Sequence, residues 1–334
     1  WHAVGIASER LVWNLYRKEM KHRCLYCYNA IEAGKDFHKK CSETFFGTPT
    51  PPKIPYSLNQ MDELAKQVVE RSIAVPGVQP KLSLSLVKEA QAQAGTRLTV
   101  VGALGGQYIF KPPSAQFPEM PENEHLTMRM AEAFGIRLVP SSLIRLVSGE
   151  LSYITKRVDR TEKGEKIHMI DMFQITEAFD KYRSSMEKVG KAVDLYSSNT
   201  LLDKTYYFDI ALFSFLTGNN DMHLKNFSMI ESPSGWVLAP AYDLLNVAIV
   251  LPEDTEELAL TLGGKKKKLK RADFEQLGEG LGLTPKQIKG AFNRMKKNQN
   301  SAVDWINRSF LSHAMKTAYV GLLEERYRQL GLKE

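Results

Sequence analysis

The feature that constrains this chain most is a short polar loop held between two apolar segments. The loop is residues 218–226, Gly-Asn-Asn-Asp-Met-His-Leu-Lys-Asn. Before it, residues 205–217 carry apolar side chains at helical spacing. After it, residues 227–230 and 236–238 are apolar and strand-like, joined by a Ser-Pro-Ser-Gly turn. Because loops fixed by buried elements commonly carry chemistry, we expect a functional site here.

The spacing inside the loop indicates which chemistry. Asp221 and Asn226 are arranged as D-x-x-x-x-N, the spacing of a kinase catalytic loop, in which the Asp receives a hydroxyl proton and the Asn holds a metal ion. Asp243 lies seventeen residues further on, at the end of the hairpin, where a second carboxylate for Mg²⁺ would be needed. The spacing alone also fits a turn that caps neighbouring helices. Together with the hairpin and Asp243, it favours a kinase.

The composition limits the class of protein. The length of 334 residues allows about two domains, and no apolar run approaches the ~18 residues of a membrane span. The first residues lack the apolar core of a signal peptide, and three cysteines are too few for a disulfide framework. We therefore expect a cytoplasmic chain without a membrane partner. The net charge of +7 suits phosphate-bearing partners but does not by itself indicate nucleic-acid binding.

All three cysteines of the chain lie near one histidine. Cys24, Cys27, His38 and Cys41 form the pattern C-x2-C-x10-H-x2-C. Three thiolates and one imidazole are a complete ligand set for a tetrahedral structural zinc. The pattern also fits a small knuckle with free thiols. A catalytic cysteine is disfavoured because no partner His or Asp repeats the arrangement elsewhere.

The periodicity predicts strands first and helices later. The expected elements are a helix at 57–71, strands at 82–87, 97–101 and 107–111, a helix at 122–134 and a hairpin at 138–147 and 151–157. Further helices are expected at 284–297, opened by a capping box, and at about 300–313 and 315–330. The basic run at 265–270 is most simply a solvated loop.

These patterns predict an α+β chain in four parts. Residues 1–19 are an extension of unknown role, and 20–56 hold the Cys/His knuckle and a proline-rich linker. Residues 57–170 form a β-rich N-lobe with a phosphate-covering loop, and 171–334 form an all-helical C-lobe apart from the catalytic hairpin. We place the lobe boundary near residues 157–172.

Taken together, the motifs resemble those of the HipA family of bacterial serine/threonine kinases, the toxins of HipBA-type toxin–antitoxin systems. The matching stretches are GVQPKLSL (77–84), YIFKPP (108–113), PENEHLTMRMAEAFGI (121–136), YITKRVDR (153–160), DMFQI (171–175), LTGNNDMHLKNFSMI (216–230) and LAPAYDLLN (238–246). They occur in order over about residues 72–246. The resemblance implies a two-lobed kinase-like fold with a small β-rich lobe and a larger helical lobe.

The resemblance also implies roles for the residues of the polar loop. Asp221 would accept the proton of the substrate hydroxyl, and Asn226 and Asp243 would hold Mg²⁺. His223 and Lys225 would complete the loop around the transferring phosphoryl group. Phosphoryl transfer depends mainly on positioning and on stabilisation of charge, so these groups are chemically sufficient.

ATP is the implied cosubstrate, and its expected contacts lie elsewhere in the chain. Lys111 would bind the phosphates, and the segment Pro76, Gly77, Val78, Gln79, Pro80 and Lys81 would cover them. Lys156, Arg157 and Val158 would form the hinge beside adenine, with Tyr242 also at the nucleotide.

Two departures from the family pattern affect what is expected. Full-length members have a further N-terminal subdomain, so this chain resembles the short form HipT, whose missing subdomain is a separate small protein. The family often carries a self-phosphorylated Ser or Thr where this chain has Ala74. Either self-inhibition at that position is absent, or Ala74 replaces a Ser or Thr in order to keep the chain active.

The leading hypothesis is a toxin kinase that phosphorylates a translation component such as an aminoacyl-tRNA synthetase. Its expected partners are a HipB-like antitoxin and the small subdomain-like protein, with DNA reached only through the antitoxin. The alternative is a non-catalytic regulatory module bound to an antitoxin and DNA. Retention of Lys111, Asp221, Asn226 and Asp243 argues against that alternative.

Overall fold

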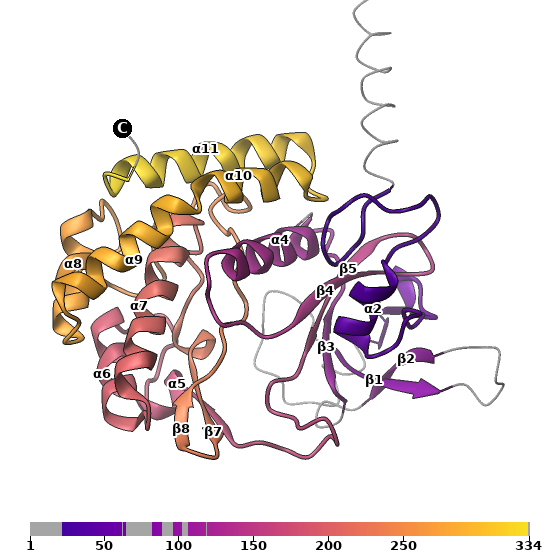
Figure 1. Cartoon of the computed structure of the whole chain (residues 1–334), viewed down its shortest axis with the longest axis horizontal. Helices are drawn as coiled ribbons and strands as arrows, with labels where there is room; N and C mark the ends of the chain where they lie inside the picture. The colour runs from indigo at the N-terminus through magenta and orange to yellow at the C-terminus, as the bar shows by residue number, and fades with distance from the viewer. Residues whose placement is uncertain are drawn as a thin grey trace, which may run out of the picture. The chain divides into compact units, whose positions relative to one another are not determined.

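The computed structural model describes residues 22–61, 63–64, 82–88, 96–101, 106–117 and 119–332 (Figure 1). These residues divide into two compact units. The first holds the described residues up to Pro113, with Pro140–Thr155 and Arg308–Phe310. The second holds Ser114–Val139, Lys156–Asn307 and the described residues from Leu311 onward.

A five-stranded sheet organises the first unit. Its strands are β1 (Leu82–Lys88), β2 (Thr96–Val101), β3 (Tyr108–Lys111), β4 (Ser141–Arg145) and β5 (Leu151–Lys156), in the order β2-β1-β3-β5-β4. β1 pairs antiparallel with β2 and β3, and β4 pairs antiparallel with β5. Leu82 and Leu84 are buried while the serines between and after them are not, as an alternating strand predicts.

Aromatic rings join the knuckle to this sheet. Helix α2 (Lys39–Phe46) places Phe45 and Phe46 against Tyr108 of β3, with ring centroids 5.9 and 6.3 Å apart. Phe37, just before the helix, packs edge-on against Phe46 at 5.5 Å. Because aromatic pairs bury large areas, these contacts fix the knuckle on the first unit.

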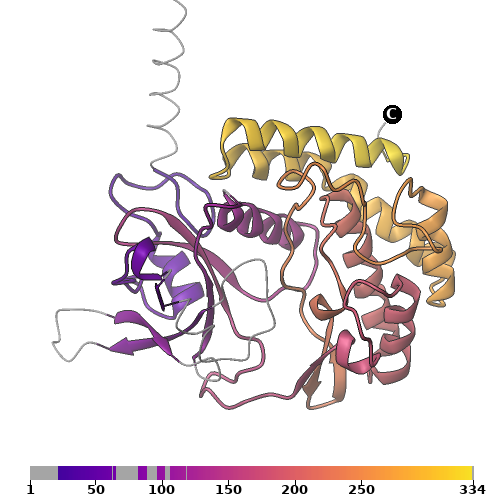
Figure 2. The ribbon, with the colours of Figure 1, turned by 180° about the vertical axis from the view of Figure 1, so that it is seen from behind.

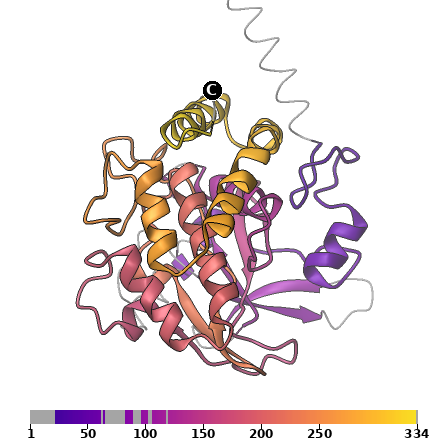
Figure 3. The ribbon, with the colours of Figure 1, turned by 60° about the vertical axis from the view of Figure 1, so that its left-hand side comes forward.

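The second unit is mostly helical (Figures 2 and 3). Its helices are α4 (Met120–Ala133), α5 (Met172–Ile175), α6 (Met186–Tyr196), α7 (Thr200–Leu216), the short 3-10 helix η1 (Leu224–Asn226), α8 (Arg271–Gly280), α9 (Pro285–Lys297), α10 (Gln299–Arg308) and α11 (His313–Gln329). A three-stranded antiparallel sheet, β6-β7-β8, completes it: β6 (Met169–Asp171), β7 (Ser228–Ser232) and β8 (Gly235–Leu238).

Helix α7 is the central helix of this unit. It is buried on all sides from Tyr207 to Leu216, as expected of a helix that is apolar all round. Phe208 packs on Phe292 of α9 at 6.3 Å, and Phe215 on Phe274 of α8 at 5.1 Å. The helix that precedes the polar loop is therefore held by its neighbours on several faces.

The structure confirms the α+β class and the expected elements, with several differences. Helix α7 begins at Thr200, five residues before the apolar pattern, and α10 ends at Arg308 rather than near 313. A third strand that no pattern predicted, β6, pairs with the hairpin and ends at Asp171, where the helical part was expected to begin. Of the helix expected at 57–71, residues 58–61 and 63–64 are helical; the remainder, like residues 1–19, lies outside the described part.

The capping box at Thr284 is confirmed. The Thr284 hydroxyl accepts a hydrogen bond from the backbone N–H of Gln287, and the Gln287 side chain accepts one from the N–H of Thr284. Within the described residues, no helix is both long and apolar enough to span a membrane.

Candidate active site

The polar loop leaves α7 through a glycine that no other residue could replace without strain. Gly218 has φ of 68°, in the left-handed region. A Cβ there would lie 2.4 Å from the Leu322 side chain and 2.8 Å from Oδ1 of Asn246. The Gly218 carbonyl accepts hydrogen bonds from the N–H groups of Val247 and Ala248, each at 3.1 Å. The loop is thus joined directly to the segment that follows Asp243.

A buried amide links the two aspartates of the site. Asn219 is fully buried, and its Oδ1 accepts from the backbone N–H of Asp221 at 3.3 Å. Its Nδ2 donates to the Asp243 carbonyl at 3.4 Å. Sequence reasoning assigned Asn219 no role. Its position could have indicated one, because an Asn side chain in a turn commonly accepts a hydrogen bond from the backbone N–H two residues later, here that of Asp221.

The D-x-x-x-x-N pair is brought together as predicted. Asn226 is buried, and its Nδ2 donates to the Asp221 carbonyl at 2.9 Å. This leaves the amide oxygen of Asn226 as the atom suited to a cation. Asp243 has φ of 57°, a backbone conformation that non-glycine residues adopt rarely and often at functional sites. An amide oxygen and a carboxylate are donors that suit Mg²⁺.

His223 is held by a lysine that sequence reasoning did not select. Its Nε2 lies 2.9 Å from Nζ of Lys181. An ammonium group has no acceptor, so Nε2 accepts and the proton of the neutral ring is on Nδ1. Burial lowers the pKa of His223 below its usual value, with Lys181 acting in the same direction and Asp221 against it. His223 is therefore neutral near pH 7.

A tyrosine hydroxyl lies on the expected catalytic carboxylate. Tyr182 Oη donates to Asp221 Oδ1 at 2.6 Å, and its ring packs edge-on against His223 at 5.1 Å. Burial, together with the hydrogen bond to Asp221, raises the pKa of Tyr182. No local sequence pattern indicates this contact, because the two residues are 39 positions apart.

Two other predicted site residues support each other. Tyr242 Oη donates to the Lys225 carbonyl at 3.0 Å and lies 2.5 Å from the Ser228 hydroxyl. The Lys225 ammonium is 4.9 Å above the Phe173 ring. Tyr242 thus contacts the end of the polar loop, whereas the sequence suggested a nucleotide contact, which stays a prediction.

The remaining residues predicted to contact the nucleotide belong to different units, or lie outside the described residues. Arg157 makes a bidentate ion pair with Asp159, at 2.7 and 2.9 Å, and burial lowers the pKa of Lys156. Lys111 belongs to the first unit, where it is 5% exposed and its Nζ lies 5.3 Å from the ring centroid of Tyr153. The segment 76–81, like Ala74, lies outside the described residues.

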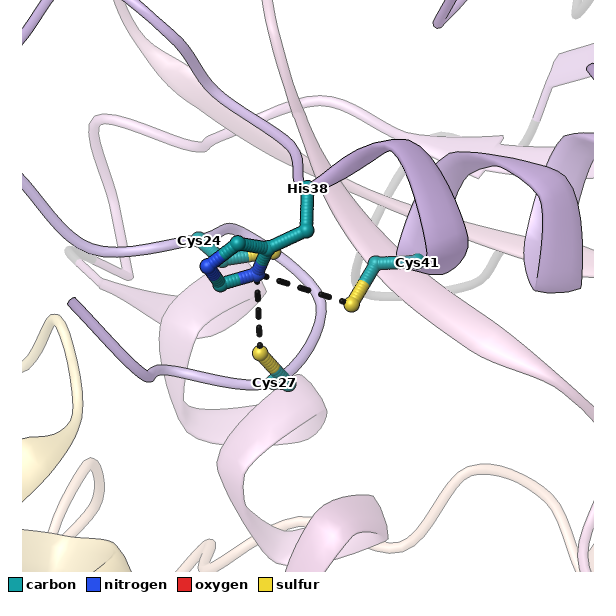
Figure 4. Close-up of side chains that lie close together, drawn as sticks. All are labelled: Cys24, Cys27, His38 and Cys41. Atoms are coloured by element: carbon teal, nitrogen blue, oxygen red, sulfur yellow. Dashed lines mark hydrogen bonds between the residues drawn. The ribbon is translucent and has the colours of Figure 1, made fainter. Parts of the chain in front are cut away.

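The four knuckle side chains do converge (Figure 4). The three sulfurs and one imidazole nitrogen all lie within 4.8 Å of one another. His38 Nδ1 is 3.5 Å from Cys27 Sγ and 3.7 Å from Cys41 Sγ. Zinc bonds of about 2.0–2.3 Å in tetrahedral geometry place ligand atoms about 3.5–3.8 Å apart. The donor set and its spacing therefore fit zinc.

One further feature suits a metal at the knuckle. His38 Nε2 lies 3.0 Å from the Ala30 carbonyl, and this kind of outer contact orients metal-bound imidazoles.

Comparison with known proteins places the chain in a family. The profile of the HipA-like C-terminal domain matches residues 73–303. The chain therefore belongs to the HipA-like C-terminal domain family, and the predicted kinase class is confirmed by homology. The match contains Lys111, Asp221, Asn226 and Asp243.

The relatives are distant in sequence. Two of the relatives that carry the name "Putative kinase" illustrate this. The one from Haemophilus influenzae is 26% identical over 71% of this chain and 75% of its own length. The other, Y4dM of Sinorhizobium fredii, is 30% identical over 64% of this chain and 55% of its own length. The serine/threonine-protein kinase toxin HipA of Shewanella oneidensis is 27% identical over 55% of this chain and 45% of its own length.

A solved structure confirms the fold class. The chain aligns with Shewanella oneidensis HipA, solved in complex with HipB and operator DNA, with a TM-score of 0.63 and 22% identity. The alignment covers 80% of this chain and 71% of that one. At this identity the likeness supports the fold alone.

Proposed function

We propose that this chain is an ATP- and Mg²⁺-dependent serine/threonine protein kinase of the toxin type. The observation that supports this best is the hydroxyl of Tyr182 at 2.6 Å from Asp221 Oδ1. That distance is what a general base requires of the hydroxyl whose proton it accepts. This contact supports the proposal that Asp221 accepts the proton of an acceptor hydroxyl.

The other residues of the loop, together with Asp243, would position the ATP phosphates and stabilise their negative charge. Asn226 Oδ1 and the Asp243 carboxylate would hold Mg²⁺, which when bound neutralises charge on the ATP phosphates. His223, neutral and with Nδ1 buried and without a partner among the described residues, would donate a hydrogen bond to a phosphoryl oxygen. Lys225 would add positive charge at the same loop.

The proposed nucleotide contacts follow the family pattern. Lys111 would pair with the ATP phosphates as a point charge, and the segment 76–81 would cover them. Residues 156–158 would lie beside adenine. Tyr242 would also contact the nucleotide, and its hydrogen bond to the Lys225 carbonyl would support the end of the polar loop.

The proposed physiological substrate is a translation component such as an aminoacyl-tRNA synthetase, and the proposed partners are a HipB-like antitoxin and a small subdomain-like protein. The support is family membership and the Shewanella oneidensis HipA structure, which contains HipB and operator DNA. Contact with DNA would then be made through the antitoxin.

Comparison of phosphorylated proteins in cells tests this function. Cells expressing the wild-type chain should gain phosphoserine or phosphothreonine on one or a few proteins, and cells expressing Asp221→Asn at equal level should not. Growth arrest with the wild type alone, relieved by the cognate antitoxin, is the accompanying expectation. Equal phosphorylation in both strains would rule out this chain as the kinase.

We also propose that the knuckle holds one structural zinc through Cys24, Cys27, His38 and Cys41. Protein purified without chelator should contain about one zinc per chain by elemental analysis. His38→Ala should lose most of it, whereas the exposed His313→Ala should not. A zinc-free wild-type protein with three freely titratable thiols would show that the knuckle is metal-free.

A further inference from the structure

Tyr182 is presented to the catalytic loop by a segment that is fixed to that loop at three points. The Lys181 carbonyl accepts from the backbone N–H of Leu224 at 3.1 Å. The Lys181 ammonium lies 2.9 Å from His223 Nε2, and the Tyr182 hydroxyl donates to Asp221 at 2.6 Å. One backbone and two side-chain contacts therefore define the register of this segment against the loop.

The flanking residues make the presentation rigid. Asp180 Oδ1 accepts from the Tyr182 N–H at 2.8 Å, so the tyrosine follows a side-chain-stabilised turn. On the other side, the Ser184 carbonyl accepts from the N–H and hydroxyl of Thr261, each at 3.2 Å, and the Thr261 carbonyl accepts from the N–H of Met186 at 2.9 Å. The backbone on both sides of Tyr182 is therefore fixed by hydrogen bonds.

The tyrosine nevertheless remains accessible. Tyr182 is 36% exposed, and Phe179 at the start of the segment is fully exposed. The Arg183 side chain is 88% exposed, and its ion pair with Asp180 is long, at 3.6 Å. A partly exposed tyrosine whose hydroxyl lies on Asp221 has the arrangement of an acceptor, not of a tyrosine enclosed in a core.

We propose that Tyr182 is a self-phosphorylation site of this chain, an inference that rests on the proposed kinase function. Tyr182 Oη attacks the γ-phosphorus of ATP while its proton passes to the Asp221 carboxylate. The bond between the γ-phosphorus and the β,γ-bridging oxygen breaks, and the products are phosphotyrosine and ADP. No oxidant, reductant or other reactant is needed.

Phosphoryl transfer to Tyr182 requires the hydrogen bond between its hydroxyl and Asp221. A phenol beside a carboxylate does not ionise unaided near pH 7, so its attack depends on a base that takes the proton. After transfer, Oη has no proton to donate to Asp221. A phosphate of about −1.5 to −2 charges would also repel that carboxylate. The modified tyrosine must therefore leave Asp221, which is then available to other hydroxyl groups.

Mass spectrometry of the full chain incubated with ATP and Mg²⁺ tests the proposal. We expect one phosphate on Tyr182, located by peptide mapping, and none at this position with Asp221→Asn. Tyr182→Phe keeps the ring against His223 and should lose this phosphate. Tyr196→Phe, which alters an exposed tyrosine on α6, is the matched control and should keep it.

Mixing experiments test the intramolecular geometry. Active chain and a mass-tagged Asp221→Asn chain, incubated together at low concentration, should give phosphotyrosine 182 on the active chain alone. Modification of the tagged chain to the same extent would overturn transfer within one molecule.

Dephosphorylated casein is added as a general acceptor in the same reaction, so that two failures can be told apart. If casein gains phosphate and Tyr182 does not, the self-phosphorylation proposal is wrong and the kinase function stands. If neither casein nor any residue of the chain gains phosphate, the kinase function itself fails.

Discussion

Asp221→Asn should lower the rate of phosphoryl transfer by about 10²–10⁴-fold, the range attributed to a general base. The amide cannot take a proton from a hydroxyl, although it can still accept the Tyr182 hydrogen bond, so the loop should keep its shape. ATP affinity should change little because this residue is needed for chemistry rather than for holding nucleotide. Turnover is measured with saturating ATP, and nucleotide affinity by calorimetry.

Asp194→Asn is the matched control for this substitution. Asp194 lies on α6, is 58% exposed and pairs with Lys204 at 2.7 Å, so its loss should leave turnover unchanged. Near-normal turnover of Asp221→Asn would remove Asp221 from the role of base, because no other change in the variant could compensate for the missing acceptor.

Asp203→Ala should destabilise the second unit by about 2–4 kcal/mol, because two buried donors would each lose a charged acceptor. Asp203 is fully buried in the first turn of α7. Its Oδ2 accepts from the Ser197 hydroxyl and from the Leu238 N–H, each at 2.6 Å, and Arg137 lies 3.6 Å from Oδ1. Truncation leaves a buried N–H of β8 without its acceptor.

The loss is measured as the free energy of unfolding in urea. Asp194→Ala is the control, because a surface ion pair contributes no more than about 1 kcal/mol. Equal, small losses in both variants would mean that the Asp203 contacts do not hold β8 to α7.

The elements that sequence patterns predicted are those whose signal is local. Helix α7 follows from its apolar spacing, and the helix at α9 from its capping box at Thr284. The knuckle follows from cysteine spacing, since its three Cys and one His lie within 18 residues, from Cys24 to Cys41. The pairing of Asp221 with Asn226 was predicted for the same reason.

The features that were missed depend on contacts between distant segments. Strand β6 has only three residues and is defined by its pairing with β7, so no alternating pattern could reveal it. Tyr182 reaches Asp221, and Asp203 reaches Leu238, across 39 and 35 positions.

Transfer of label from ATP tests the central claim most directly. The purified chain is incubated with Mg²⁺, dephosphorylated casein and ATP carrying the label either on the γ-phosphate or on the α-phosphate. A kinase must move label from the γ position into protein, with equimolar ADP released, and must move none from the α position. Incorporation of α-label, or no incorporation from either ATP, would contradict the proposal that residues 218–226 form a protein kinase catalytic loop.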